Sequence, residues 1–299
     1  MNIAYLHPRY WVIWFCYGSL LLLNLLPYRV QMYLGKKIGR LMLACSKNRR
    51  HIAKTNLAIC FPDLSEEQKR KLLEKHAESL GMSLFEFGIG HWWSDERFDA
   101  ISEIEGLGNL TVALKKGQGA LMLFGHFTTL EIMSRILRNH VLFHPVYRKF
   151  NNPLLEFLIK RQRLRWVDKV IEHDDLRSVI RSLKKNIPIF YIPDRNFGRR
   201  YAVFVPFFGF PAATITATSR LAAVMNSPVL PMVQQRLPGN RGYKLIIQKP
   251  LENFPGKDPQ ADAARVNAII EAQVRDNPAD YLWVHRRFKT RPEGEPPVY

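Results

Sequence analysis

From about residue 110 onward, short apolar runs alternate with segments of helical periodicity, and this alternation restricts the fold more than any other feature of the chain. Strands that alternate with helices are typical of βαβ units, in which helices cover a parallel sheet. We therefore predict an α/β fold with a largely parallel central sheet flanked by helices. The predicted strands are residues 120–124, 141–146, 188–192, 228–233 and 244–247, and the predicted helices are residues 129–138, 153–166, 175–185, 216–225 and 259–275.

Residues 29–109 are predicted to form a largely helical lead-in to this α/β region. Ser65 precedes two glutamates and a series of apolar residues at helical spacing, which is the pattern of a capped helix start. A chain of 299 residues is long enough for one large α/β domain with an appended segment. We predict two parts, a hydrophobic membrane anchor at residues 1–28 and one domain at residues 29–299 that includes the helical lead-in.

The segment from Trp11 to Leu26 is an uncharged, hydrophobic run of sixteen residues that ends at Pro27. A transmembrane helix needs roughly 20 apolar residues, so this run either crosses a membrane tightly or lies partly embedded in its surface. A helix buried in the protein core is a third interpretation. We expect an N-terminal membrane-anchoring helix, because cations follow the run and no signal-peptide cleavage site does.

The net charge of +18 is unevenly distributed along the chain. No acidic residue occurs before Asp63, whereas nine Lys or Arg do, and a second basic block covers residues 135–200. Such a balance implies a polyanionic partner, which is nucleic acid, anionic lipid or an acidic protein. Next to a hydrophobic run, an anionic membrane surface fits better than nucleic acid. Because most of the early cations follow the run, the positive-inside rule places the body of the protein on the cytoplasmic face.

The stretch "ALMLFGHFTTLEI", residues 120–132, contains only two ionisable side chains, His126 and Glu131. It reads as a strand, a glycine turn and a helix start, and a second such junction, "PIFYIPDR", delivers Asp194 and Arg195. Sites in parallel sheets gather where strands end and helices begin. We predict that Glu131 accepts the second N–H of the His126 imidazole, which would make the ring a general base for a hydroxyl.

On spacing alone, a core histidine beside a solvated glutamate is the more common explanation of this pair. A metal site is not expected, because no further ligand lies at metal-binding spacing from His126. The three cysteines, Cys16, Cys45 and Cys60, also lack metal-ligand or redox spacing. The context of the pair therefore has to decide between the two interpretations.

That context resembles the glycerolipid-type acyltransferase superfamily, in which a His-x4-Asp/Glu pair follows a hydrophobic strand. The full pattern is similar to the bacterial lipid A late acyltransferases, the lauroyl and myristoyl transferases that act on a Kdo-lipid A precursor. The stretches that carry the resemblance are "HPRYW" (7–11), "NLAICFPDLS" (56–65), "GHFTTLE" (125–131), "VYRKFNNPLLE" (146–156), "RLR" (163–165), "YIPDRNFG" (191–198), "VFVPFFG" (203–209) and "LWVHRRFKTRPEGEP" (282–296). The last of these is the most specific.

The resemblance implies a role for each candidate site residue. His126 would be the base that deprotonates a 3-hydroxyacyl hydroxyl of the acceptor, and Glu131 its charge-relay partner. Arg163 and Asp194 match an arginine and an aspartate needed for catalysis. Arg148 resembles a position that contacts the substrate. Arg195 is also expected to bind substrate, although many relatives have Gln or His at its position.

The resemblance also implies the partners of the reaction. The donor would be acyl-acyl-carrier protein, and the acceptor a Kdo-lipid A precursor at the cytoplasmic face of the inner membrane of a Gram-negative bacterium. Because a thioester is already activated, no metal, cofactor or covalent nucleophile is required. Backbone N–H groups after Gly125, or an arginine, could stabilise the oxyanion of the intermediate. The acidic carrier and the acceptor phosphates would account for the basic surface.

Two other functions remain open on the sequence. The same fold could act on another acceptor, such as a lysophospholipid or a mannosylated phosphoinositide. Alternatively, the chain could be a catalytically silent, membrane-bound basic protein that recruits nucleic acid or acidic partners. No helix-turn-helix or aromatic RNA-binding motif is present, so nucleic acid is not an expected partner. If the chain is a lipid A late acyltransferase, its ending "HRRFKTRPEGEP" resembles the lauroyl-type branch of that family more than the myristoyl branch.

Overall fold

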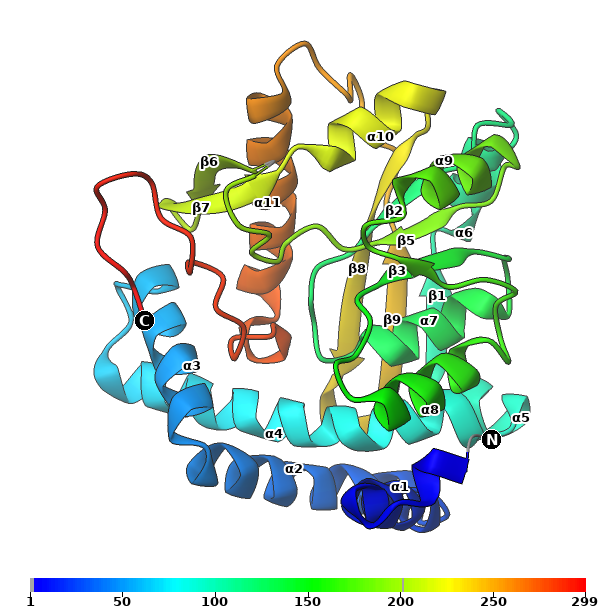
Figure 1. The fold of residues 1–299 in the computed structure, drawn as a ribbon, viewed down its shortest axis with the longest axis vertical. Coiled ribbons are helices and arrows are strands. Elements are labelled where there is room, and N and C mark those ends of the chain that lie inside the picture. The colour runs from blue at the N-terminus through cyan, green and yellow to red at the C-terminus, as the bar shows by residue number, and fades with distance from the viewer. Residues whose placement is uncertain (1–2, 201) are drawn as a thin grey trace.

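The computed structural model of the chain describes residues 3–200 and 202–299. Its centre is a seven-stranded sheet in the order β1-β9-β8-β2-β5-β3-β4, and a two-stranded hairpin, β6-β7, lies beside it (Figure 1). The strands are β1 (Ser102–Glu105), β2 (Leu121–Leu123), β3 (His144–Tyr147), β4 (Ile171–Glu172), β5 (Ile189–Tyr191), β6 (Ala202–Phe207), β7 (Phe210–Ile215), β8 (Val229–Leu237) and β9 (Gly242–Ile247).

The predicted α/β fold with a largely parallel sheet is confirmed. Strands β8, β2, β5, β3 and β4 are mutually parallel, whereas β9 pairs antiparallel with β8 and β1 pairs parallel with β9. Each of the five predicted strands is present within a few residues of its expected position. The sequence pattern did not indicate β1, which interrupts the predicted helical lead-in, nor β4 and the β6-β7 hairpin.

Helices cover both faces of the sheet and form a layer along one side of it (Figure 1). The five helices predicted after residue 110 and the helix predicted after Ser65 are all present. The helices are α1 (Trp11–Leu23), α2 (Tyr28–Cys45), α3 (Lys47–Cys60), α4 (Glu66–Trp92), α5 (Asp95–Asp99), α6 (Leu107–Leu114), α7 (Leu130–Arg138), α8 (Pro153–Arg163), α9 (Leu176–Lys184), α10 (Ala217–Met225) and α11 (Pro259–Asp276), with short 3-10 turns η1 (Ile3–Leu6), η2 (Pro8–Tyr10), η3 (Pro238–Asn240) and η4 (Pro278–Asp280).

The sheet separates two hydrophobic cores because successive strand residues point to opposite faces. Leu121 and Leu123 of β2 pack into one core, and Met122 between them packs into the other. The paired strands follow the same alternation, since Leu121 lies opposite both Ile189 and Val229. Burial on both faces explains why these strands read as continuous apolar runs in the sequence.

Helices α2 and α4 cross at very close range because glycines line their contact. A Cβ atom on Gly81 would lie 1.9 Å from the carbonyl oxygen of Gly35, and one on Gly39 would lie 1.9 Å from that of Ala77. Ser65 caps α4 as predicted, since its side chain and that of Gln68 each accept from the other's backbone N–H.

The predicted N-terminal membrane anchor is not confirmed as a spanning helix. Helix α1 contains 13 residues, which at ~1.5 Å per residue is shorter than the ~30 Å hydrocarbon core of a bilayer. Among residues 3–200 and 202–299, no helix combines the length and the apolar character needed to cross a membrane. Burial of α1 in the core is also wrong, because none of its residues is buried.

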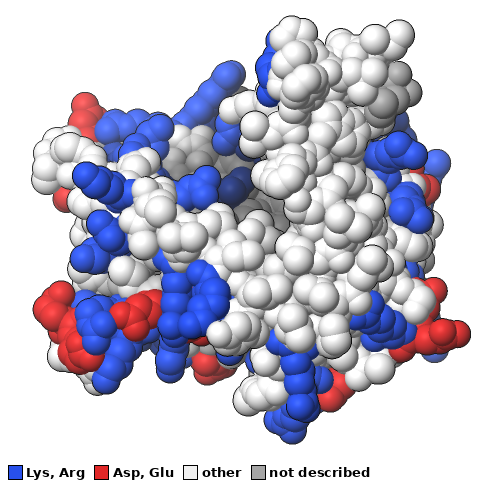
Figure 2. Space-filling model, turned by 90° about the horizontal axis from the view of Figure 1, so that it is seen from below, with Lys and Arg blue, Asp and Glu red and all other residues white. Residues whose placement is uncertain are grey.

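The helix layer on this side combines apolar and basic surface. Trp11, Val12 and Phe15 of α1 are 62–75% exposed, while Tyr17 on its other side packs beside α8. Figure 2 shows this face as a broad uncharged area, with Lys and Arg gathered at its edges and around a hollow. The predicted division into a membrane anchor at residues 1–28 and a domain at residues 29–299 stays a prediction.

Candidate active site

Three neighbouring parallel strands deliver the predicted site residues to one edge of the sheet. His126 follows β2, Asp194 follows β5, and Arg148 directly follows β3. Because β2, β5 and β3 are parallel neighbours, their carboxyl ends meet at the same edge. The three side chains are therefore brought together although Asp194 lies 68 residues beyond His126.

Asp194 is bonded to His126 through both of its carboxylate oxygens. Oδ1 binds the Nδ1 atom of the imidazole, and Oδ2 accepts the backbone N–H of His126 at 2.9 Å. The hydroxyl of Tyr281 donates to the same Oδ2 at 2.9 Å. Asp194 is buried, whereas the His126 side chain is 15% exposed. The carboxylate is therefore fixed, and the ring reaches the surface of the site.

The charge of Asp194 determines which nitrogen of His126 carries the proton. Burial alone would raise the pKa of Asp194, but its attraction to His126 and its hydrogen bonds lower the pKa below the usual range. An ionised carboxylate accepts a proton-bearing nitrogen, so Nδ1 of neutral His126 is the donor. Nε2 then keeps its lone pair, and it has no partner among the described residues.

The prediction that Glu131 orients His126 is wrong for this structure, because Asp194 occupies that position. Glu131 lies in the first turn of α7, and its side chain points toward α4 and α8 instead. Arg163 at the end of α8 binds Glu131 Oε1, and His91 Nε2 of α4 lies 3.2 Å from Oε2. The loop after the neighbouring strand β5 carries Asp194 to His126, whereas the first turn of α7 carries Glu131 to Arg163.

Arg163, Glu131 and His91 form a second charged cluster beside the first. Burial would raise the pKa of Glu131, but the charge of Arg163 and the bond from His91 lower the pKa below the usual range. Arg163 also lies over the ring of Tyr147, 5.8 Å from its centroid. The predicted residues Glu131 and Arg163 are therefore joined to each other. His91 was not predicted, since it stands within a helical pattern without any motif around it.

Arg195 and Arg148 bring positive charge to the same edge. Burial lowers the pKa of Arg195; Asp194 opposes this shift and the positive charge of Arg148 adds to it. Among the described residues, neither arginine forms a salt bridge with a carboxylate. Arg195 therefore lies within electrostatic range of Asp194, and Arg148 lies within electrostatic range of Arg195.

A buried polar network supports the loop that carries His126. Arg236 of β8 binds Glu86 of α4 in two-pronged fashion, at 2.8 and 3.0 Å, and also binds Asp280. The backbone N–H of Thr128 donates to the Asp280 carbonyl at 2.8 Å. Sequence reasoning missed Arg236 and Tyr281. Tyr281 directly precedes the distinctive "LWVHRRFKTRPEGEP" stretch, and that stretch was the sequence signal that could have pointed to this tyrosine.

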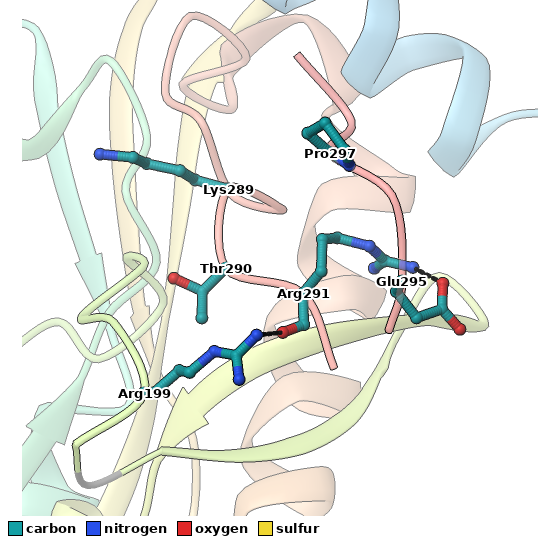
Figure 3. A pocket seen from close by; sticks show the side chains of 6 residues that line it. All are labelled: Arg199, Lys289, Thr290, Arg291, Glu295 and Pro297. Atoms are coloured by element: carbon teal, nitrogen blue, oxygen red, sulfur yellow. Dashed lines mark hydrogen bonds and ion pairs between the residues drawn. The ribbon is translucent and has the colours of Figure 1, made fainter. Parts of the chain in front are cut away.

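A separate pocket opens near the C-terminal segment (Figure 3). Arg199 donates to the carbonyl of Arg291 at 3.1 Å, and Arg291 binds Glu295 at 2.7 Å. Lys289, Thr290 and Pro297 complete its lining, and it contains none of the predicted site residues. The chemistry of the site therefore rests on the strand edge rather than on this pocket.

A histidine with one nitrogen bonded to a buried carboxylate and the other left as a lone pair can remove a proton from a hydroxyl. Here such a histidine lies at the carboxyl edge of a parallel α/β sheet, where the active sites of α/β enzymes gather.

Comparison with known proteins gives the family. Residues 1–290 match the family model described as bacterial lipid A biosynthesis acyltransferase. The chain is 39% identical to the lipid A biosynthesis lauroyltransferase of Escherichia coli (strain K12), over 99% of this chain and 97% of that protein. It is 38% identical to the lipid A biosynthesis palmitoleoyltransferase of the same organism, over 99% and 96%. With the lipid A biosynthesis myristoyltransferase of that organism the identity is 23%, over 98% and 91%. The chain belongs to the bacterial lipid A biosynthesis acyltransferase family, and it is an acyltransferase.

Proposed function

We propose that this acyltransferase transfers a fatty acyl chain from acyl-acyl-carrier protein to a 3-hydroxyacyl hydroxyl of a Kdo-lipid A precursor. The observation that carries the proposal is the 37–39% identity, over nearly the whole chain, to several lipid A biosynthesis acyltransferases. The lower identity to the myristoyltransferase favours the lauroyl-type branch, as the "HRRFKTRPEGEP" ending does.

In the proposed reaction, the oxygen of the acceptor hydroxyl attacks the carbonyl carbon of the thioester. At the same time, Nε2 of His126 takes the proton of that hydroxyl. Asp194 keeps the ring in the required tautomer and stabilises the positive charge that the ring gains. The carbon–sulfur bond then breaks, and the proton on His126 passes to the leaving thiolate. The chain's own side chains suffice for this step, because the thioester already supplies an activated acyl group.

The cationic residues of the site are assigned to the acceptor and the donor. Arg148 and Arg195 would bind the phosphate or carboxylate groups of the acceptor, as guanidinium groups do in two-pronged geometry. Glu131 would hold Arg163 at the edge of the site instead of orienting His126. The net charge of +18 favours both an acidic carrier protein and a phosphorylated acceptor.

We also propose that the protein is attached to the cytoplasmic face of the inner membrane through α1 and α2, which lie in the membrane surface. The exposed apolar residues of α1 support this arrangement, as do Val30, Tyr33 and Leu41 on α2, which are 40–65% exposed. Residues 30, 33 and 41 recur at helical spacing, so they share one face of α2. The absence of any acidic residue before Asp63 suits an anionic lipid surface.

A purified-enzyme assay tests the proposed donor and acceptor. Acyl-acyl-carrier protein and acyl-CoA are offered separately, each with the Kdo-lipid A precursor and with a lysophospholipid as rival acceptors. We expect transfer from the carrier protein to the lipid A precursor. Preference for acyl-CoA and the lysophospholipid would overturn the proposal and support the alternative acceptor. The His126→Ala variant is the background control in every arm.

A further inference from the structure

The C-terminal segment lies directly against both loops of the site. Its Tyr281 pairs with Phe127 in an antiparallel bridge, and the N–H of Leu282 donates to the His126 carbonyl at 2.9 Å. The hydroxyl of Tyr281 binds Asp194. The stretch "HRRFK" (285–289) begins three residues after Leu282, which is bonded to His126, and four residues after Tyr281, which is bonded to Asp194. Its first residue, His285, has no role in the function proposed above.

The ring of His285 is fixed by its surroundings. Its Nε2 atom accepts the backbone N–H of Asn196 at 3.2 Å, and Asn196 lies two residues beyond Asp194. Its own N–H donates to the Leu282 carbonyl at 3.1 Å, and its carbonyl accepts from Asn56 at 2.8 Å. The backbone N–H, the carbonyl and Nε2 of His285 are therefore hydrogen-bonded, and Nδ1 is the remaining polar atom of this residue.

His285 is neutral under physiological conditions. Burial, together with the positive charge of Arg195, lowers its pKa to about 3. Because Nε2 accepts a hydrogen bond, the single proton of the neutral ring lies on Nδ1. Among the described residues, this N–H has no acceptor, and it is not sealed from solvent. It is therefore an uncommitted donor on a ring that lies within electrostatic range of His126.

Main-chain donors near His126 are already occupied. The N–H groups of His126, Phe127 and Thr128 donate to Asp194, to the Gly125 carbonyl and to the Asp280 carbonyl, at 2.8–2.9 Å. The backbone donors expected directly after Gly125 are thus unavailable at these three positions. An acyl-transfer site still needs a donor for the charge that develops on the carbonyl oxygen.

We propose that the Nδ1–H of His285 donates to the carbonyl oxygen of the acyl thioester and stabilises the oxyanion of the tetrahedral intermediate. When the acceptor oxygen bonds to the carbonyl carbon and its proton moves to His126, the carbonyl electrons move to this oxygen. They return when the carbon–sulfur bond breaks and the thiolate takes the proton from His126. A neutral donor serves both steps, because it does not lose its proton to the oxyanion. The inference rests on the proposed acyl transfer, but not on the identity of the acceptor.

Two substitutions separate this role from a structural one. Asn places an amide N–H near the position of Nδ1 but cannot reach Asn196, whereas Gln can accept from Asn196 but lacks a donor at Nδ1. We expect His285→Gln to lower kcat on the order of 10²-fold with little change in KM, as loss of one oxyanion donor does. His285→Asn should retain most of kcat, although its thermal midpoint falls because the bond to Asn196 is lost.

The reverse order of the two variants would overturn the proposal, since it would show that the bond to Asn196 is what matters. Equal losses of kcat in both variants would also overturn it. Each kcat is measured below the thermal transition of the variant, so that unfolding does not enter the comparison. The assay uses whichever acceptor the wild-type enzyme accepts. Failure of the lipid A proposal would therefore change the acceptor in the assay but not the expected ratio between the variants.

Discussion

At His126, a single buried carboxylate determines which ring nitrogen carries the proton. Asp194→Asn should therefore reduce transfer on the order of 10²–10⁴-fold, since the amide favours the wrong tautomer and leaves the imidazolium unstabilised. His126→Ala should abolish transfer while the fold is retained. Initial rates and circular dichroism spectra measure the two effects.

Asp168→Asn is the matched control, because Asp168 also binds a histidine, His144, at 2.7 Å, away from the strand edge. Its activity should stay near wild type. Near-normal turnover of either His126→Ala or Asp194→Asn would contradict the proposed base.

Glu131 and Arg163 bind each other, so their contributions to activity should not be additive. Glu131→Ala and Arg163→Ala should each reduce activity strongly, and the double variant should lose no more than the worse single one. The cycle should give a coupling free energy of about 1–3 kcal/mol. Arg163→Lys should recover only part of the loss, because lysine lacks the planar guanidinium. Additive losses would show that the two residues act separately.

At the scale of elements, the contact between α2 and α4 depends on the absence of side chains. Gly81→Ala would place a methyl group 1.9 Å from the Gly35 carbonyl oxygen, so the helices must separate. We expect a loss of about 3 kcal/mol in the free energy of unfolding, measured by denaturant titration.

Gly108→Ala in α6 is the control, because nothing lies within 4 Å of its added methyl group. Alanine in a helix should stabilise the protein by about 0.5–1 kcal/mol there. Equal effects at the two positions would show that helix propensity, and not the close crossing, accounts for Gly81.

For the whole molecule, acidification should lower stability well before the carboxylates titrate. Burial lowers the pKa of His76 to about 4, so the folded protein resists a proton that the unfolded chain accepts near pH 6.5. The contribution of His76 is complete above pH 6.5 and is lost as the pH falls toward 4, on the order of 2 kcal/mol by pH 5. The pKa of His285 is also lowered, to about 3, so this residue too lowers the stability of the fold as the pH falls below 6.5.

Asp194 and Glu131, whose pKa values are lowered, stabilise the fold at higher pH and lose this contribution only as the pH falls below about 4. Thermal midpoints between pH 7.5 and 4.5 test the histidine contribution. His76→Asn, which keeps a donor for the Ala279 carbonyl, should show a flatter profile. A wild-type midpoint that is constant from pH 7 to 5 would contradict the assignment.

Membrane attachment is also a property of the whole molecule. Replacing Val12, Phe15 and Leu22 by serine removes apolar side chains that are 68–75% exposed on α1. On anionic vesicles the wild type should stay bound in roughly 0.5 M salt, while the triple variant should be released, because only screened charge remains. Serine at Val112, Leu142 and Val224, which are 50–62% exposed elsewhere, is the control.

A triple variant that remains bound at high salt would place the attachment on another surface, such as the apolar face of α2. Substitution is preferable to removal of residues 1–28. The carbonyl of buried Asn24 accepts from Gln31 at 2.9 Å and from Trp93 at 3.2 Å, so truncation would remove part of the protein's own packing.

The sequence alone determined the elements around the site. Apolar runs that are buried on both faces, such as residues 120–124, read as parallel strands because no polar face interrupts them. The capped start of α4 and the helices after residue 110 followed from local pattern, since capping and periodicity act over a few residues. His126 and Asp194 could be singled out because each follows a predicted strand, whereas Arg148 was assigned from the family resemblance.

How these residues pair depends on the order of the strands in the folded chain. Strand order is not written in any local pattern, so the placement of β5 beside β2 could not be foreseen, and it is this neighbour that gives His126 its carboxylate. Glu131 is closer in the sequence, but the first turn of α7 carries it to Arg163 and His91. The length of α1 was decided in the same way. Its hydrophobic run continues to Leu26, yet the helix ends at Leu23, where Asn24 turns inward and receives hydrogen bonds from α2 and from Trp93.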